Sequence, residues 1–104
     1  MLRRIMYSLE GRSNKWSGVR KKHLSKESCC AACDADRELE VHHVVPFDID
    51  PARELDASNL ITLCRYCHLV IAHLRDFRIY NQNLLLDINV FRMNRQYAYR
   101  SLSK

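Results

Sequence analysis

The sequence lacks any apolar run near the roughly 20 residues that span a bilayer, so no transmembrane helix and no membrane partner are expected. It also lacks internal repeats, low-complexity segments and linkers, and we expect its 104 residues to form a single domain, 1–104. A signal-peptide pattern is missing, which predicts a cytoplasmic protein. A chain this short buries only about 60–68% of its unfolded surface, so a bound metal is a plausible supplement to a thin core.

Cysteine occurs in an odd number, which argues against a secreted disulfide scaffold. Two Cys-x-x-Cys pairs, Cys30/Cys33 and Cys64/Cys67, are separated by thirty residues. Each pair can present two thiolates to one ion, and structural zinc takes four ligands in a tetrahedron. The pattern therefore predicts a structural Zn²⁺ site, with buried, inert cysteines as the alternative. Cys29 is the surplus residue, and a Cys29/Cys33 pairing stays open.

Charge is divided along the chain although the net value is only +5. Residues 1–26 carry eight Lys/Arg against one acid, and residues 74–104 carry six against two. Residues 27–73 carry three against nine. Two basic flanks around an acidic centre suit ends that contact a polyanion and a centre that binds cations, and ordinary solvated surface is the alternative.

Hydrophobic periodicity predicts an α+β chain. A basic helix is expected over about 13–26 with Ser13 as its cap, and alternation predicts a strand over 38–45. Residues 47–58 are predicted to form an acidic loop, either solvated or with the acidic residues of 48–56 hydrogen-bonded to nearby groups. Residues 59–63 are predicted to form a second strand that leads through the second cysteine pair into a helix. Leu74 and Phe77 are expected among the apolar members of that helix. A further helix is expected over about 83–98, apolar on two sides, which suits a monomer or a homodimer.

Three histidines accompany the predicted strands. His42 and His43 are adjacent on a strand, so their side chains should point to opposite faces. His68 directly follows the second cysteine pair and is expected across from the strands. Together these residues are expected to converge on one basic-edged cleft.

In this arrangement the sequence resembles the HNH endonucleases, built on the ββα-metal (His-Me finger) fold. His43, Asn59 and His68 match the three letters of the motif, framed by the cysteine pairs and by the segments 40–46 (EVHHVVP) and 59–64 (NLITLC). Residues 12–20 (RSNKWSGVR) are similar to the lead-in of small stand-alone phage and bacterial members. The resemblance covers roughly 12–80 and implies a ββα-metal core over about 28–76 with flanking helices.

The resemblance implies a DNA endonuclease that leaves 5′-phosphate and 3′-hydroxyl ends, by nicking or double-strand cleavage. It implies that His43 deprotonates the attacking water, that Asn59 holds this base in place, and that His42 and His68 bind one catalytic divalent cation. An imidazole suits proton transfer near neutral pH, and a cation can neutralise charge on the phosphate. Mg²⁺ prefers oxygen ligands, so imidazoles favour Mn²⁺, Ni²⁺ or Zn²⁺.

Many relatives have a further histidine four residues after the last motif histidine, where this chain has Ala72. His73 stands five residues later, about 140° around an ideal helix, and is interpreted either as a ligand of the catalytic metal or as a surface or outer-shell residue. DNA contacts are expected from a basic set near the N-terminus: Arg12, Lys15, Arg20, Lys21 and Lys22. Trp16 is expected to be a core anchor, and the lysines of its helix to contact phosphates or merely to be solvated.

Two other functions stay open. The first is a zinc-stabilised DNA-binding or phage-packaging module without significant catalysis, and a phage terminase is then a candidate partner. The second is a protein-interaction adaptor that uses the apolar C-terminal helix. The resemblance favours the nuclease in the cytoplasm of a bacterial host cell.

Overall fold

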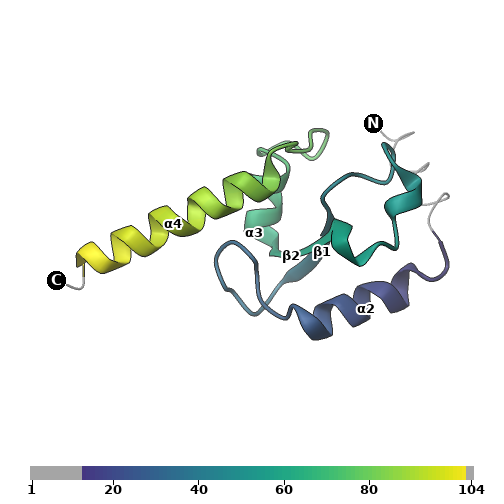
Figure 1. Ribbon diagram of the computed structural model, residues 1–104, viewed down its shortest axis with the longest axis horizontal. Coiled ribbons are helices and arrows are strands. Elements are labelled where there is room, and N and C mark those ends of the chain that lie inside the picture. Colours follow the sequence, from purple (N-terminus) through teal and green to yellow (C-terminus); the bar gives the residue numbers. More distant parts are fainter. Residues whose placement is uncertain (1–12, 103–104) are drawn as a thin grey trace.

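The computed structural model describes residues 13–102 and shows a small two-stranded sheet flanked by helices (Figure 1). Strand β1 (Leu39–His43) pairs antiparallel with β2 (Leu60–Cys64), with Leu39 opposite Cys64 and His43 opposite Leu60. Every residue of β2 is buried, as expected of a strand covered on both faces. The predicted α+β class and the predicted pair of strands are confirmed.

The helix α2 (Trp16–Lys26) contacts both strands and begins later than the predicted residue 13. The reason is local, because Ser13 forms a turn in place of a helix cap. Its Oγ accepts the backbone N–H of Lys15 at 3.1 Å, and its carbonyl accepts that of Trp16 at 3.1 Å. His23 is the buried residue of this helix, and its Nε2 lies 3.0 Å from a carboxylate oxygen of Glu27.

The chain between the strands is not the uniformly solvated loop that its acidic residues predict. It contains two short 3₁₀ turns, η1 (Pro51–Arg53) and η2 (Ala57–Asn59). Asp56 caps the second of these turns by accepting the backbone N–H of Ser58 at 2.9 Å. Glu54 between the two turns is buried, with only 5% of its surface exposed. One acidic residue of the loop is therefore part of the interior, while most of the residues around it stay exposed.

After β2 the chain forms the short helix α3 (Arg65–Cys67) and then one π-helical stretch, η3 (His68–Ala72). The backbone N–H of His73 donates to the carbonyl of His68 at 3.2 Å, five residues back, which is the wide turn of a π-helix. The predicted continuous helix ends at this point. Leu74 and Phe77, predicted as apolar helix members, lie beyond it and are 51% and 61% exposed.

The final helix α4 (Leu84–Leu102) extends past the predicted residue 98. Leu84 and Ile88 bury their side chains in the core, one turn apart on the same face. Arg92 and Arg95 then reach residues 31–34, where both donate to the Asp34 carboxylate at 3.0 and 2.7 Å. The helix is thus fixed to the first cysteine turn as well as to the core.

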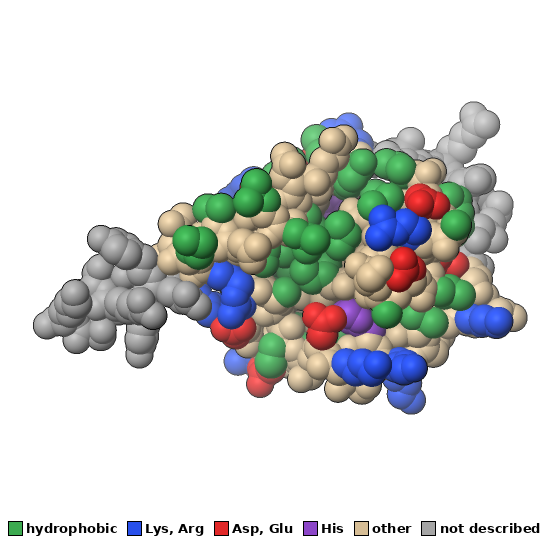
Figure 2. All heavy atoms as spheres, in the orientation of Figure 1, with side chains coloured by type: hydrophobic (Ala, Val, Ile, Leu, Met, Phe, Trp, Pro, Cys, Tyr) green, Lys and Arg blue, Asp and Glu red, His purple; other side chains and the backbone are tan. Residues whose placement is uncertain are grey.

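Apolar side chains remain exposed on α4 and on residues 74–79 after η3, and Figure 2 shows part of those on the helix as a green area. The most exposed are Leu86 and Met93, at 63% and 68%. Within residues 13–102 no helix is both long enough and apolar enough to cross a membrane.

Candidate metal centres

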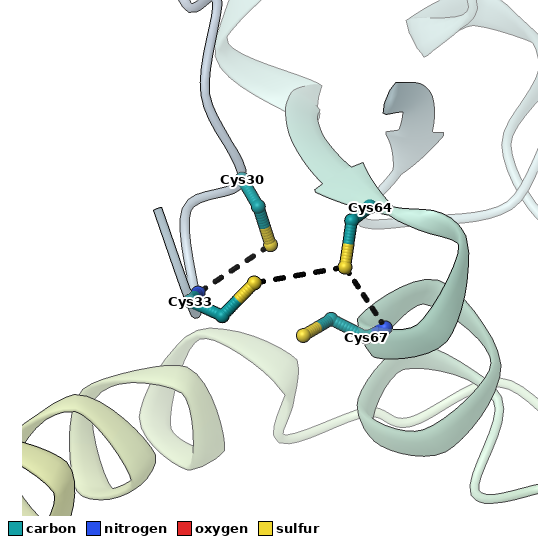
Figure 3. A group of neighbouring side chains, drawn as sticks. All are labelled: Cys30, Cys33, Cys64 and Cys67. Atoms are coloured by element: carbon teal, nitrogen blue, oxygen red, sulfur yellow. Dashed lines mark hydrogen bonds between the residues drawn. The ribbon is translucent and has the colours of Figure 1, made fainter. Parts of the chain in front are cut away.

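Two turns far apart in the sequence bring four cysteines together (Figure 3). Cys30 and Cys33 come from the turn before β1, Cys64 is the last residue of β2, and Cys67 is the last residue of α3. Their sulfur atoms all lie within 4.8 Å of one another. The first turn is fixed to the sheet because the backbone N–H of Ala31 donates to the carbonyl of Thr62 at 2.8 Å.

The spacing of the sulfur atoms fits a tetrahedral metal ion. Sγ of Cys33 lies 3.6 Å from Sγ of Cys64, too far for a disulfide bond of about 2 Å. Four sulfurs about 2.3 Å from one ion lie about 3.8 Å apart in a regular tetrahedron. Cys33 and Cys67 also donate backbone N–H groups to Sγ of Cys30 and Cys64, each at 3.5 Å. Cys29 is exposed and outside the cluster.

The environment prepares these thiols unequally for a metal. Burial raises the pKa of Cys30, but hydrogen bonds from the backbone of Cys64, Cys33 and Ala32 outweigh it and lower the value to about 7. Burial raises the pKa of both Cys33 and Cys67 above that of a free thiol. Burying several thiolates together is costly unless a cation neutralises them, so the cluster favours a bound divalent ion.

A second cluster is made of three histidines from different elements. His42 comes from β1, His68 begins η3 and His73 follows η3. Nε2 of His68 lies 3.0 Å from Nδ1 of His42 and 3.2 Å from Nε2 of His73. Ligand nitrogens about 2.05 Å from one tetrahedral ion would lie about 3.3 Å apart, so these three nitrogens are spaced for a common metal.

Outer partners leave those nitrogens available to a metal. The opposite nitrogen of His68, Nδ1, lies 2.7 Å from a carboxylate oxygen of Glu40, and Nδ1 of His73 lies 2.6 Å from the carbonyl oxygen of Ile79. Each partner favours a proton on Nδ1 and thereby a lone pair on Nε2. The left-handed backbone of Leu74 and Arg75 (φ 52° and 70°) turns the chain back toward Ile79.

Burial favours the neutral form of two histidines in the cluster, His42 and His68. Burial, followed by the neighbouring imidazoles of His68, His73 and His43, lowers the pKa of His42 to about 3. Burial also lowers the pKa of His68, although Glu40 opposes this effect. Neutral imidazole is the form that binds metals. Phe77 packs beside the cluster, its ring centre 5.0 Å from that of His73 and 5.7 Å from that of His68.

The π-helical turn explains why His73 reaches the cluster. On an α-helix it would lie about 140° from His68, but the wider turn closed by the His73-to-His68 backbone bond brings it round to the same side. Of the two interpretations of His73, this position favours the ligand. Ala72, at the spacing typical of many relatives, is fully buried in the core.

His42, His43 and His68 were expected to converge, but His43 lies outside the histidine cluster. Its ring is buried and tilted against that of Trp16, with centres 4.6 Å apart. Its Nε2 lies 2.9 Å from the carbonyl oxygen of Glu54. Because a carbonyl only accepts, Nε2 carries the proton and Nδ1 carries the lone pair.

Asn59 is fully buried and joins three parts of the chain. Its Oδ1 accepts the backbone N–H of Val45 at 2.8 Å, and its Nδ2 donates to the carbonyls of Val45 at 3.0 Å and Arg53 at 3.2 Å. Arg53 directly precedes Glu54, whose carbonyl contacts His43. The amide thus braces the loop that holds the histidine ring.

The predicted DNA contacts fall mostly on α2. Lys15, Arg20, Lys21 and Lys22 are exposed, and Figure 2 shows basic side chains along the edge of the molecule that α2 forms. Arg12 lies outside the described residues. Sequence reasoning missed Glu40 and Glu54. Glu40 had a signal, since residues two apart on a strand share a face and it shares one with His42. Glu54 had none.

Two strands, the helical segment that follows them and two sets of converging metal-binding side chains define a small ββα-metal domain. Residues 27–71 match the family model described as HNH endonuclease, a family whose domains are in general nucleases that use a divalent metal and act on DNA. No curated protein and no solved structure is similar enough to count as a match.

Proposed function

We propose that the protein is a metal-dependent DNA endonuclease that hydrolyses phosphodiester bonds to leave 5′-phosphate and 3′-hydroxyl ends. One observation carries the proposal: three imidazole nitrogens lie within 4.8 Å of one another, and two of them, from His42 and His68, belong to the segment 27–71 that matches the HNH model. In this proposal His42, His68 and His73 hold the catalytic cation, and the four cysteines hold a structural Zn²⁺.

His43 is the proposed general base. Its Nε2 proton is engaged by the carbonyl of Glu54, so Nδ1 is the atom that would accept a proton from the attacking water. Asn59 holds the loop that supplies this carbonyl. A divalent cation supplies charge stabilisation for the phosphate and the departing 3′-oxygen when it is bound. Nitrogen ligands favour Mn²⁺, Ni²⁺ or Zn²⁺ over Mg²⁺ at this site.

The exposed basic residues on and just before α2 are proposed to bind the DNA backbone. Lys15, Arg20, Lys21 and Lys22 are exposed there, and exposed lysines and arginines neutralise phosphates without reading sequence. A second candidate function is a zinc-stabilised DNA-binding or phage-packaging module without catalysis. The burial of His43, with 6% of its surface exposed, favours this alternative because a base must reach water.

Plasmid cleavage separates the two functions. Purified, zinc-loaded protein should relax or linearise supercoiled plasmid with Mn²⁺ or Ni²⁺, whereas His43→Ala and His73→Ala should not. His23→Gln is the matched control, because His23 is buried but pairs with Glu27 outside the cluster. DNA binding without cleavage under any divalent ion would refute the nuclease and leave the binding module.

A further inference from the structure

The helix α2 precedes the segment 27–71 that matches the HNH model, yet it contacts the proposed base directly. Trp16, the first residue of the helix, places its ring centre 4.6 Å from that of His43, with the planes tilted by 33°. This centroid distance lies within the range of about 4.5–7 Å at which aromatic rings pack favourably. One side of the His43 ring is therefore set by a residue that the family segment does not contain.

Glu54 connects the same helix to the other side of His43. Both oxygens of its buried carboxylate accept the backbone N–H of Ser13, at 3.0 and 3.2 Å, just before α2 begins. Its own carbonyl accepts Nε2 of His43 at 2.9 Å. A single residue thus holds the start of the helix through its side chain and the imidazole through its backbone.

The contacts form a closed ring of neighbours. Ser13 binds Glu54, Glu54 binds His43, His43 packs on Trp16, and Trp16 donates its backbone N–H to the carbonyl of Ser13 at 3.1 Å. Movement of any member displaces the others, since a side chain in a packed interior has little free volume. The His43 ring is therefore fixed at its edge by a hydrogen bond and at its face by the indole.

We infer that α2 completes the catalytic unit, with Trp16 and Glu54 acting as positioning residues that fix the orientation and the tautomer of His43. The inference rests on the proposed function. It gives α2 two roles, because its exposed lysines are the proposed DNA contacts while its first residue packs on the base. A displacement near 1 Å in a catalytic group can cost about 100-fold in rate, so losing the contacts that hold His43 should lower the rate measurably.

Kinetics of the full-length protein test the inference. Glu54→Ala and Trp16→Ala should lower kcat for plasmid nicking at least 10-fold, while KM and the affinity of the histidine site for Mn²⁺ stay within about 3-fold. Glu54→Gln keeps an acceptor for Ser13 and Trp16→Phe keeps an aromatic face, so both should restore kcat to within about 3-fold of wild type.

Two exposed residues away from His43 provide matched controls. Asp36→Ala removes an exposed carboxylate and is the control for Glu54→Ala. Tyr66→Ala removes an aromatic ring that is 65% exposed and is the control for Trp16→Ala. Both control variants should leave kcat unchanged. The inference would be overturned if Glu54→Gln were as slow as Glu54→Ala, or if the variants raised KM and left kcat unchanged. The proposed function would still stand in either case, provided that the wild-type protein nicks DNA.

Long-range ¹H–¹⁵N correlation spectra of the imidazoles give a readout that does not need cleavage. His43 should hold only the Nε2-protonated tautomer in wild type and in Glu54→Gln and Trp16→Phe, and a mixture of tautomers in the alanine variants. An unchanged tautomer in all variants would overturn the positioning claim. If wild type never nicks DNA, the proposed function fails separately, and these spectra alone decide whether α2 positions the ring.

Discussion

Glu40 gives the sharpest test of the histidine site, because it acts on the metal only through His68. Its carboxylate lies 2.7 Å from Nδ1 of His68, and Nε2 of the same ring faces His42 and His73 at 3.0 and 3.2 Å. A carboxylate on the far nitrogen fixes the tautomer and increases the basicity of the ligand nitrogen. Replacing it should therefore weaken the metal site without removing a ligand.

The expected loss can be graded by substitution. Outer-shell changes of this kind cost about 10- to 100-fold in metal affinity, which corresponds to about 1.4–2.7 kcal/mol. Glu40→Gln keeps an oxygen that can accept the Nδ1 proton and loses only the charge, so it should fall near 10-fold. Glu40→Ala loses both and should fall near 100-fold.

Calorimetric titration of Mn²⁺ or Ni²⁺ into zinc-loaded protein measures this loss. Glu27→Gln is the matched control, since Glu27 pairs with His23 at 3.0 Å in α2, away from the cluster. Its affinity should equal that of wild type. Equal affinities for wild type and Glu40→Ala, or an equal loss in Glu27→Gln, would refute the argument that Glu40 tunes His68.

Three further predictions concern stability and DNA binding. Chelation that strips the four-cysteine site should abolish the thermal unfolding transition seen by circular dichroism, since structural zinc can contribute about 10–16 kcal/mol and domains have only about 5–15 to lose; an unchanged transition would contradict this. In protein whose cysteine site holds zinc and whose histidine site is empty, the pKa of His42 is lowered to about 3, so the unfolded chain binds more protons between about pH 3 and 6.5. Stability should therefore fall as pH drops through this window, by up to about 1.4 kcal/mol per pH unit in denaturant titrations, with no such slope above pH 7. Replacing Lys21 and Lys22 by alanine should reduce the salt slope of DNA binding by roughly 2 in fluorescence anisotropy, whereas His43→Ala should leave it unchanged.

The features that depend on spacing were open to prediction from the sequence. Two Cys-x-x-Cys turns separated by a strand-forming stretch have few ways to fold other than around one ion, and the four sulfurs do converge. Strand alternation correctly assigned His42 and His43 to opposite faces, because a side-chain period of two leaves no alternative. Strand β1 is shorter than predicted at both ends and β2 is displaced by one residue, since strand ends are set by turn geometry.

The features that depend on tertiary contacts were not open to prediction in this way. A helical period of 3.6 residues places His73 on a different side of the helix from His68. The wider π-helical turn of η3 brings the two side chains to the same side. Glu54 lies among acidic residues that read as solvated, and its burial follows from a partner forty-one positions earlier, Ser13. No local sequence pattern predicts such a contact.

Arg92 and Arg95 have a consequence that reaches beyond both metal centres. Their guanidinium groups donate to the carbonyls of Ala31 and Cys33. These carbonyls belong to the turn that supplies two of the four clustered cysteines. The direction in which α4 leaves the domain is thus set by a loop whose shape depends on its ion. Loss of that ion would therefore release α4 from this turn at the same time as it unfolds the cysteine cluster.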